Sequence, residues 1–164
     1  CRRMAPRRVP EMSASNESSG TALDRADVVG RWSLLSWRQT YDDGRVTHPM
    51  GEQPVGYIEY GARHMSCMLA RRGRAPFTSG GQWNANAAEK AGAYDSFMSY
   101  CGTYEIEGDV IVHHVMMSLF PNWEGGVQRR RAQLIDGRLH LLARIEEGTP
   151  QARTAALIWE RAAD

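Results

Sequence analysis

The sequence predicts an all-β fold, a barrel or a sandwich, with one inserted α-helix. Short segments with alternating apolar residues follow one another between residues 30 and 161. Turn-forming pairs such as Asp-Gly separate several of these segments. One stretch between them is rich in Ala, Glu and Lys and shows helical spacing instead. Regularly spaced strands joined by turns are typical of antiparallel barrels and sandwiches.

The strands are placed by alternation and by the turns that end them. The first begins at residue 30 and runs to the hairpin signal at residues 42–44. After the helix, two strands are joined at residues 107–109, and the Asp-Gly pair at residues 136–137 joins two more. The expected strand segments are 30–41, 55–60, 64–71, 102–120, 127–145 and 154–161, and both 102–120 and 127–145 hold two strands.

The inserted helix is expected within residues 84–101. We place it at 86–100, because Asn84 or Asn86 can cap its start. The preceding residues, 71–83, are rich in Gly, Pro and Arg and predict a loop. A loop and helix inserted into a barrel often cover its mouth, so we expect a lid here. The apolar positions at helical spacing are Ala88, Ala91, Tyr94, Phe97, Met98 and Cys101.

Length and composition indicate one folded domain after a tail. A chain of 164 residues is long enough to bury one sizeable core. Residues 1–23 are rich in Arg, Pro, Ser and Glu and lack apolar periodicity, which predicts a disordered tail. The domain is therefore expected at residues 24–164, with order beginning near Asp27.

The charge pattern and the cysteines limit the function classes. Although the net charge is +1, the residues after the first 20 carry 16 basic and 17 acidic groups. This balance gives no electrostatic case for binding nucleic acid. The apolar runs are too short for a transmembrane segment, and no signal-peptide pattern is present. Three cysteines without a CxxC motif favour a reducing compartment, so we expect a cytoplasmic location.

Several motifs resemble a known family. The Gly30-Arg31-Trp32 opening is similar to the Gly-x-Trp start of lipocalins and related calycin barrels. More specifically, VGYIEY, HMSCML, EKAGAYDSFMSYCGTYEI, VIVHHVMMSLFPNW and DGRLHL resemble the bacterial and fungal lipocalin-like domain family, over about residues 27–161. The resemblance implies a lipocalin-like antiparallel up-and-down β-barrel with an internal cavity and one inserted helix. It implies no established catalytic set.

Four residues are assigned structural roles. Arg161 resembles the arginine that packs on the Gly-x-Trp tryptophan in lipocalins, so we expect it to close the barrel against Trp32. Pro121 should end a strand, because proline cannot donate to the sheet ladder. Trp123 is expected to cover the barrel end, while a ligand-stacking role for this side chain remains the alternative.

The adjacent His113 and His114 are the most prominent polar pair. Adjacent residues on a strand face opposite sides, so the two cannot chelate one metal ion. The set that contains His113 is otherwise apolar, which predicts that His113 points into the lumen and His114 outward. No metal-ligand spacing links them to the other histidines, and we expect no metal and no cofactor. The predicted lumen set is Ile111, His113, Val115, Met117 and Leu119.

The same alternation places other side chains in the lumen. Gln128, Arg130, Ala132 and Leu134 share one face, and Trp32, Leu34 and Ser36 share another. Cys67 and Cys101 are read as buried small hydrophobic residues. A mostly apolar lumen with a few polar groups matches small-molecule pockets. The predicted ligand-binding set is His113, Arg130, Gln128, Tyr104 and Tyr57.

Two functions from different classes share this pocket. The leading hypothesis is binding of a small hydrophobic or amphipathic molecule in the lumen. The alternative is a cofactor-free isomerase or cyclase of a polyketide- or terpenoid-like substrate, with His113 as acid or base and Arg130 or Tyr104 stabilising an oxyanion. If side chains fill the lumen, neither hypothesis holds. The sequence leaves the ligand and the oligomeric state open.

Overall fold

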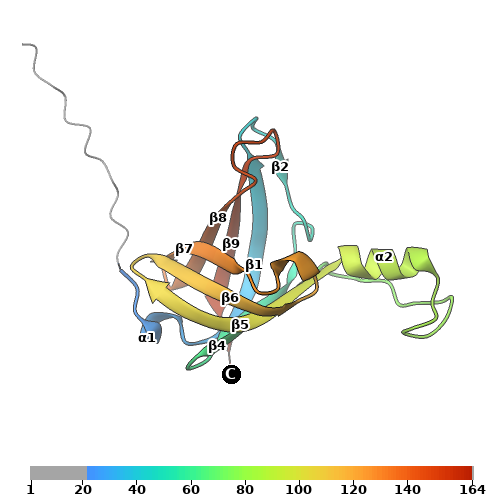
Figure 1. The fold of residues 1–164 in the computed structure, drawn as a ribbon, viewed down its shortest axis with the longest axis horizontal. Helices are drawn as coiled ribbons and strands as arrows, with labels where there is room; N and C mark the ends of the chain where they lie inside the picture. The colour runs from blue at the N-terminus through green and yellow to red at the C-terminus, as the bar shows by residue number, and fades with distance from the viewer. Residues whose placement is uncertain (1–21, 164) are drawn as a thin grey trace, which may run out of the picture.

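The first and last long strands pair with each other and close the sheet into a barrel (Figure 1). The computed structural model describes residues 22–163. Strand β1 (Gly30–Tyr41) lies antiparallel to β9 (Arg153–Arg161) along nearly its whole length. The predicted tail lies outside the described residues except for its last two, of which Leu23 packs against the core.

The long strands from β1 to β9 pair antiparallel in the order of the sequence, as in an up-and-down barrel. The short β2 (Val46–Thr47) folds back on the end of β1 after the predicted hairpin turn. At the predicted turn of residues 136–137, Asp136 and Gly137 have φ of 51° and 75°, as a two-residue hairpin turn requires. The predicted strands are confirmed, at β3 (Val55–Tyr60), β4 (His64–Ala70), β5 (Phe97–Glu107), β6 (Val110–Ser118), β7 (Val127–Ile135), β8 (Arg138–Ile145) and β9.

One end of the barrel is closed by the residues that the sequence suggested. A short helix, α1 (Arg25–Val28), lies at this end, and the Trp32 indole donates to the carbonyl oxygen of Val28 at 2.8 Å. The Arg161 guanidinium lies 4.3 Å from the centre of the Trp32 ring. It also donates at 2.8 Å to the carbonyl oxygens of Asp27 and Val29. The start and end of the barrel are thereby tied together.

The inserted helix is shorter than predicted and is not a lid. Helix α2 (Ala87–Asp95) begins at the predicted cap, where the Asn86 side chain accepts from the backbone N–H of Glu89. Residues 97–101 instead form the start of β5 and pair with β4, because a ladder of backbone hydrogen bonds outweighs weak helical spacing. The helix buries no residue and projects away from the barrel in Figure 1.

A bulge in β6 limits the predicted alternation. His113 and Val115 point inward as predicted, but Met116 is an extra residue opposite the step from Cys101 to Gly102. The bulge reverses the faces, so Met117 is 64% exposed and the prediction that it faces the lumen is wrong. Gly102 fits this bulge because a Cβ there would lie 1.8 Å from the carbonyl oxygen of His114.

A second bulge lies in β1. The register with β9 shifts between Leu34 and Ser36. Trp32 and Leu34 are buried as predicted, but the reversal moves Ser36 off their face. Beyond the bulge, Trp37 and Gln39 point toward the interior. Residues that sequence alternation assigned to the outside therefore line the inside of the barrel.

Candidate functional site

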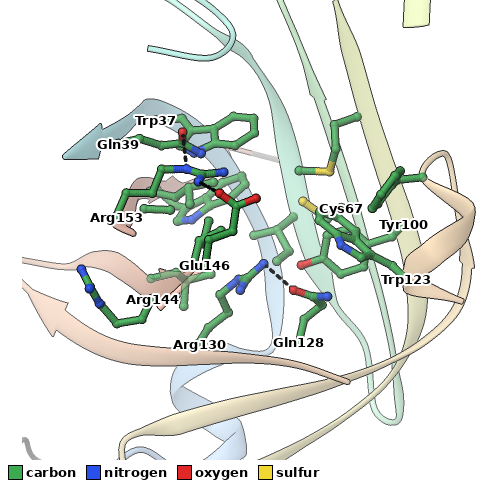
Figure 2. A pocket seen from close by; sticks show the side chains of 18 residues that line it. Trp37, Gln39, Cys67, Tyr100, Trp123, Gln128, Arg130, Arg144, Glu146 and Arg153 are labelled. Carbon is green, nitrogen blue, oxygen red and sulfur yellow. Dashed lines mark hydrogen bonds and ion pairs between the residues drawn. The ribbon is translucent and has the colours of Figure 1, made fainter. Parts of the chain in front are cut away.

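The interior of the barrel contains a cavity of about 520 Å³ (Figure 2). This volume is within the range of small-molecule sites. Apolar and aromatic side chains form most of its wall, and neither α2 nor the loop before it contributes to it. The aromatic members of the wall are Trp37, Tyr100, Phe120, Trp123 and Trp159, and the polar or charged members are Gln39, Cys67, Gln128, Arg130, Arg144, Glu146 and Arg153.

His113 is held between two tyrosines behind the cavity wall. Its side chain is fully buried. Its Nε2 lies 2.9 Å from the Tyr60 hydroxyl oxygen, and its Nδ1 lies 2.9 Å from the Tyr100 hydroxyl oxygen. Among the three, Tyr100 alone lines the cavity. A ligand in the cavity would therefore contact Tyr100 rather than the histidine.

Burial determines the protonation of this trio. It lowers the pKa of His113 to about 3, with smaller contributions from the charges of Arg130 and His114. The imidazole is therefore neutral near pH 7, with one nitrogen donating and the other accepting. Burial also raises the pKa of Tyr60 and of Tyr100, so both phenols stay protonated. The trio is an uncharged hydrogen-bonded chain.

Two arginines of the cavity wall already have carboxylate partners. Arg144 donates to Asp42 at 2.8 Å and to Glu147 at 3.2 Å. Its hydrogen bond lowers the pKa of Asp42 below the ordinary value. Arg153 forms an ion pair with Glu146, and its Nε also donates to Gln39. These ion pairs lie toward the ends of β8 and β9 and orient the two guanidinium groups.

Arg130 is bonded differently from the other two. Its Nη2 donates to the Gln128 side-chain oxygen at 3.2 Å, and its Nη1 approaches the carbonyl oxygen of Arg129 at 3.4 Å. Arg130 and Gln128 lie next to each other on the inner face of β7, as predicted (Figure 2). The charge of Arg130 also acts on Cys67 and on Tyr100 across the cavity.

Trp123 belongs to the cavity wall and not merely to the barrel end. The helical turn η1 (Pro121–Trp123) follows the end of β6, as expected for a strand stopped by proline. The Trp123 ring meets Tyr100 edge-on at 5.7 Å and Phe120 edge-on at 5.8 Å between ring centres. Trp123 therefore offers an aromatic surface to whatever occupies the cavity.

Two predicted ligand-binding tyrosines lie away from the cavity. Tyr57 is on the outer face of β3, where its hydroxyl donates to the sulfur of Met68, because Ile58 and Tyr60 take the inner positions. Its predicted orientation is wrong. Tyr104 does point inward, but its hydroxyl donates to the carbonyl oxygen of Gly61 at 2.8 Å, apart from the cavity.

The residues that sequence reasoning missed include Tyr60, Tyr100, Trp37, Trp159 and Arg153. Tyr100 had a usable signal, since it lies four residues before the inward-facing Tyr104 and would share its face on one continuous strand. Assigning residues 84–101 to a helix hid that signal. Trp37 had none, because its inward orientation depends on the β1 bulge.

Cysteines and histidines form no metal cluster in residues 22–163, where no group of three or more metal-ligating side chains is found. Cys67 is buried in the cavity wall, and burial raises the pKa of its thiol to about 12. Cys101 is partly exposed and lies in β5, not in a helix. No helix in the described part of the chain is long and apolar enough to cross a membrane.

Sequence comparison agrees with the barrel fold. The sequence profile of the lipocalin-like domain matches residues 29–162, which is most of the chain. The chain belongs to the lipocalin-like domain family. The predicted resemblance is confirmed, and family and fold together support a ligand-binding barrel in general terms. A search of curated proteins gave no match to this lipocalin-like chain.

Proposed function

We propose that the protein binds a small hydrophobic or amphipathic molecule inside its barrel. The observation that carries this proposal is a cavity of about 520 Å³ walled by five aromatic side chains and a few polar groups. Small-molecule sites have this composition, because apolar walls supply affinity and a few polar groups supply orientation. Covering about 200 Å² of apolar ligand surface would contribute about 5 kcal/mol before the cost of association.

Native mass spectrometry of freshly purified protein, together with titration of the neutral dye N-phenyl-1-naphthylamine, tests this proposal. We expect a removable small-molecule adduct, and dye fluorescence that saturates at one equivalent. Ala155 lines the cavity, whereas its neighbour Ala156 does not. Ala155→Phe should therefore weaken dye binding about tenfold or more by filling the space, and Ala156→Phe should leave it unchanged.

Thermal unfolding of both variants separates a filled cavity from a misfolded barrel. Wild-type protein that carries no adduct and binds no dye would contradict the proposal. Dye binding that survives Ala155→Phe in a folded protein would place the dye elsewhere and contradict it as well.

A second candidate, a cofactor-free isomerase or cyclase, is favoured by the position of Tyr100. Its hydroxyl contacts both His113 and the cavity, and the Arg130 charge acts on it. Because His113 lies behind the wall, proton donation to a substrate would come from Tyr100 and not from the histidine. Chromatography of the bound molecule distinguishes the two candidates. Simple binding predicts the same compound in wild type and Tyr100→Phe, whereas isomerisation predicts a different isomer in the variant.

A further inference from the structure

The charge of Arg130 is not neutralised by a carboxylate of the described chain. Arg144 and Arg153, the other arginines of the cavity wall, each have acidic partners. Within residues 22–163, Arg130 is paired instead with the Gln128 amide oxygen and a backbone carbonyl oxygen. A cation inside a partly apolar cavity is costly unless a counter-charge accompanies it. The Arg130 guanidinium therefore lacks a counter-charge among the described residues.

Arg130 also lies where a bound molecule would reach it. Figure 2 shows its guanidinium extending into the cavity beside Gln128. Its positive charge favours the ionised forms of Cys67 and Tyr100, which line the same cavity, so these three groups lie close together. The guanidinium is planar and can donate two parallel hydrogen bonds to a carboxylate.

The hydrogen-bonded trio orients a second donor toward the same place. Tyr60 is fully buried away from the cavity, and its hydroxyl has His113 Nε2 as its polar partner within the described chain. Tyr60 must therefore donate to Nε2, since a buried hydroxyl hydrogen without an acceptor is costly. The proton of the neutral imidazole then resides on Nδ1 and is donated to the Tyr100 oxygen. Consequently the Tyr100 hydroxyl keeps its own hydrogen, whose partner in the described chain is the Cys67 sulfur. A thiol sulfur is a weak acceptor, so an anionic ligand oxygen can take its place.

Two other donors of the wall residues are buried without a partner. The indole N–H groups of Trp37 and Trp159 have no hydrogen-bond partner in the described part of the chain. The acceptors in the wall have donors within the chain, since Gln128 accepts from Arg130, and Gln39 and Glu146 accept from Arg153. Arg130 is therefore the charged donor of the wall without a carboxylate partner among the described residues, which matches a ligand group that accepts hydrogen bonds.

We infer that the ligand carries an anionic oxygen group, of the carboxylate or enolate kind, held between the Arg130 guanidinium and the Tyr100 hydroxyl. The apolar part of the ligand then packs against the tryptophans of the wall. This inference rests on the proposed function, which requires only an apolar or amphipathic molecule. His113 acts here as a positioning residue, because it fixes which hydrogen the Tyr100 hydroxyl presents to the cavity.

Two dyes that share one skeleton test the inference. N-phenyl-1-naphthylamine is neutral, and 8-anilinonaphthalene-1-sulfonate is the same skeleton with an anionic group. Arg130→Gln should weaken binding of the sulfonate about tenfold or more and change binding of the neutral dye less than about twofold. Tyr100→Phe should act in the same direction with a smaller factor, and Arg130→Lys should retain part of the preference.

Arg129→Gln is the matched control, because Arg129 lies next to Arg130 on the same strand but pairs with Glu107 on the outside. It should leave both dyes unaffected. Decanoate should also displace the sulfonate dye more effectively than decan-1-ol does, which extends the result to carboxylates. Unchanged neutral-dye binding in each variant shows that the barrel is intact.

The outcomes separate the inference from the proposed function. If both dyes bind equally well and Arg130→Gln changes neither, the cavity binds ligands but the anion site is wrong. If Arg130→Gln and Arg129→Gln weaken binding of the sulfonate dye equally, surface charge attracts the sulfonate. This result also overturns the inference. If neither dye binds wild-type protein, the proposed function itself fails.

Discussion

At the scale of single residues, the interior polarity depends on His113 and its two tyrosine partners. Each ring nitrogen has a phenol at 2.9 Å, so the buried imidazole is satisfied without a charge. Protonation would leave both nitrogens donating and would introduce a charge among apolar groups, next to Arg130. This burial gives the folded protein a defined response to acid.

The stability of the protein should decrease as the pH falls below 6.5. The pKa of His113 is about 3 in the fold and near the ordinary 6.5 when unfolded, so the unfolded chain takes up the proton first. The stability from this residue is therefore complete above pH 6.5 and is lost by about 1.4 kcal/mol per pH unit as the pH falls toward 3. Chemical denaturation between pH 5 and pH 7 measures this slope.

The variant His113→Gln should lack this contribution to the slope, whereas His48→Gln, at an exposed histidine, should keep it. The window lies above the lowered pKa of Asp42, so loss of that ion pair does not contribute. An identical pH dependence in wild type and His113→Gln would show that the buried imidazole is not the responsible group.

At the scale of elements, two bulges decide which side chains reach the cavity. The β1 bulge moves Trp37 and Gln39 to the inner face, and the β6 bulge moves Met117 to the outer face. A one-residue shift has this effect because side chains alternate with a period of two. The bulge at Gly102 depends on a close backbone approach that other residues do not permit.

Replacement of Gly102 by alanine should therefore destabilise the fold. The added Cβ would lie 1.8 Å from the His114 carbonyl oxygen, so the backbone must shift. We expect a loss of about 1–3 kcal/mol, as for other overpacked positions. Gly92→Ala in α2 is the control, because no atom lies within 4 Å of that added Cβ and alanine favours a helix. Urea denaturation that finds Gly102→Ala as stable as Gly92→Ala would contradict this account of the bulge.

At the scale of the whole molecule, closure joins residues more than 130 positions apart in the chain. Pairing of β1 with β9 removes the open edges that the two terminal strands would otherwise present. Arg161 supports this closure with its hydrogen bonds to two carbonyl oxygens and its contact with Trp32. The cavity depends on the closed barrel because residues from β1, β8 and β9 form part of its wall.

The variant Arg161→Gln should lower the free energy of unfolding by about 1–3 kcal/mol, through the lost carbonyl bonds and cation–π contact. Arg38→Gln provides the comparison, because Arg38 is also exposed on a closing strand but lies outside this cluster. Thermal and urea unfolding of both variants measure the difference. Equal stability of Arg161→Gln and Arg38→Gln would show that Arg161 does not stabilise the closure of the barrel.

The sequence by itself determined the all-β class, the order and ends of most strands, the closing pair Trp32 and Arg161, and the inward orientation of His113. These features follow from local alternation, from turn chemistry and from the family resemblance. Arg130 and Gln128 were also found in this way, because β7 alternates without interruption on either side of them.

Only the tertiary structure decided what the cavity contains. The two bulges reverse strand faces through long-range register, which no local pattern encodes. The pairing of β4 with β5 overrides helical spacing at residues 97–101 and brings Tyr100 to His113. The lack of a carboxylate beside Arg130, among the described residues, likewise emerges only when distant strands meet. The physical reason is common to these cases: each depends on contacts between residues far apart in the chain.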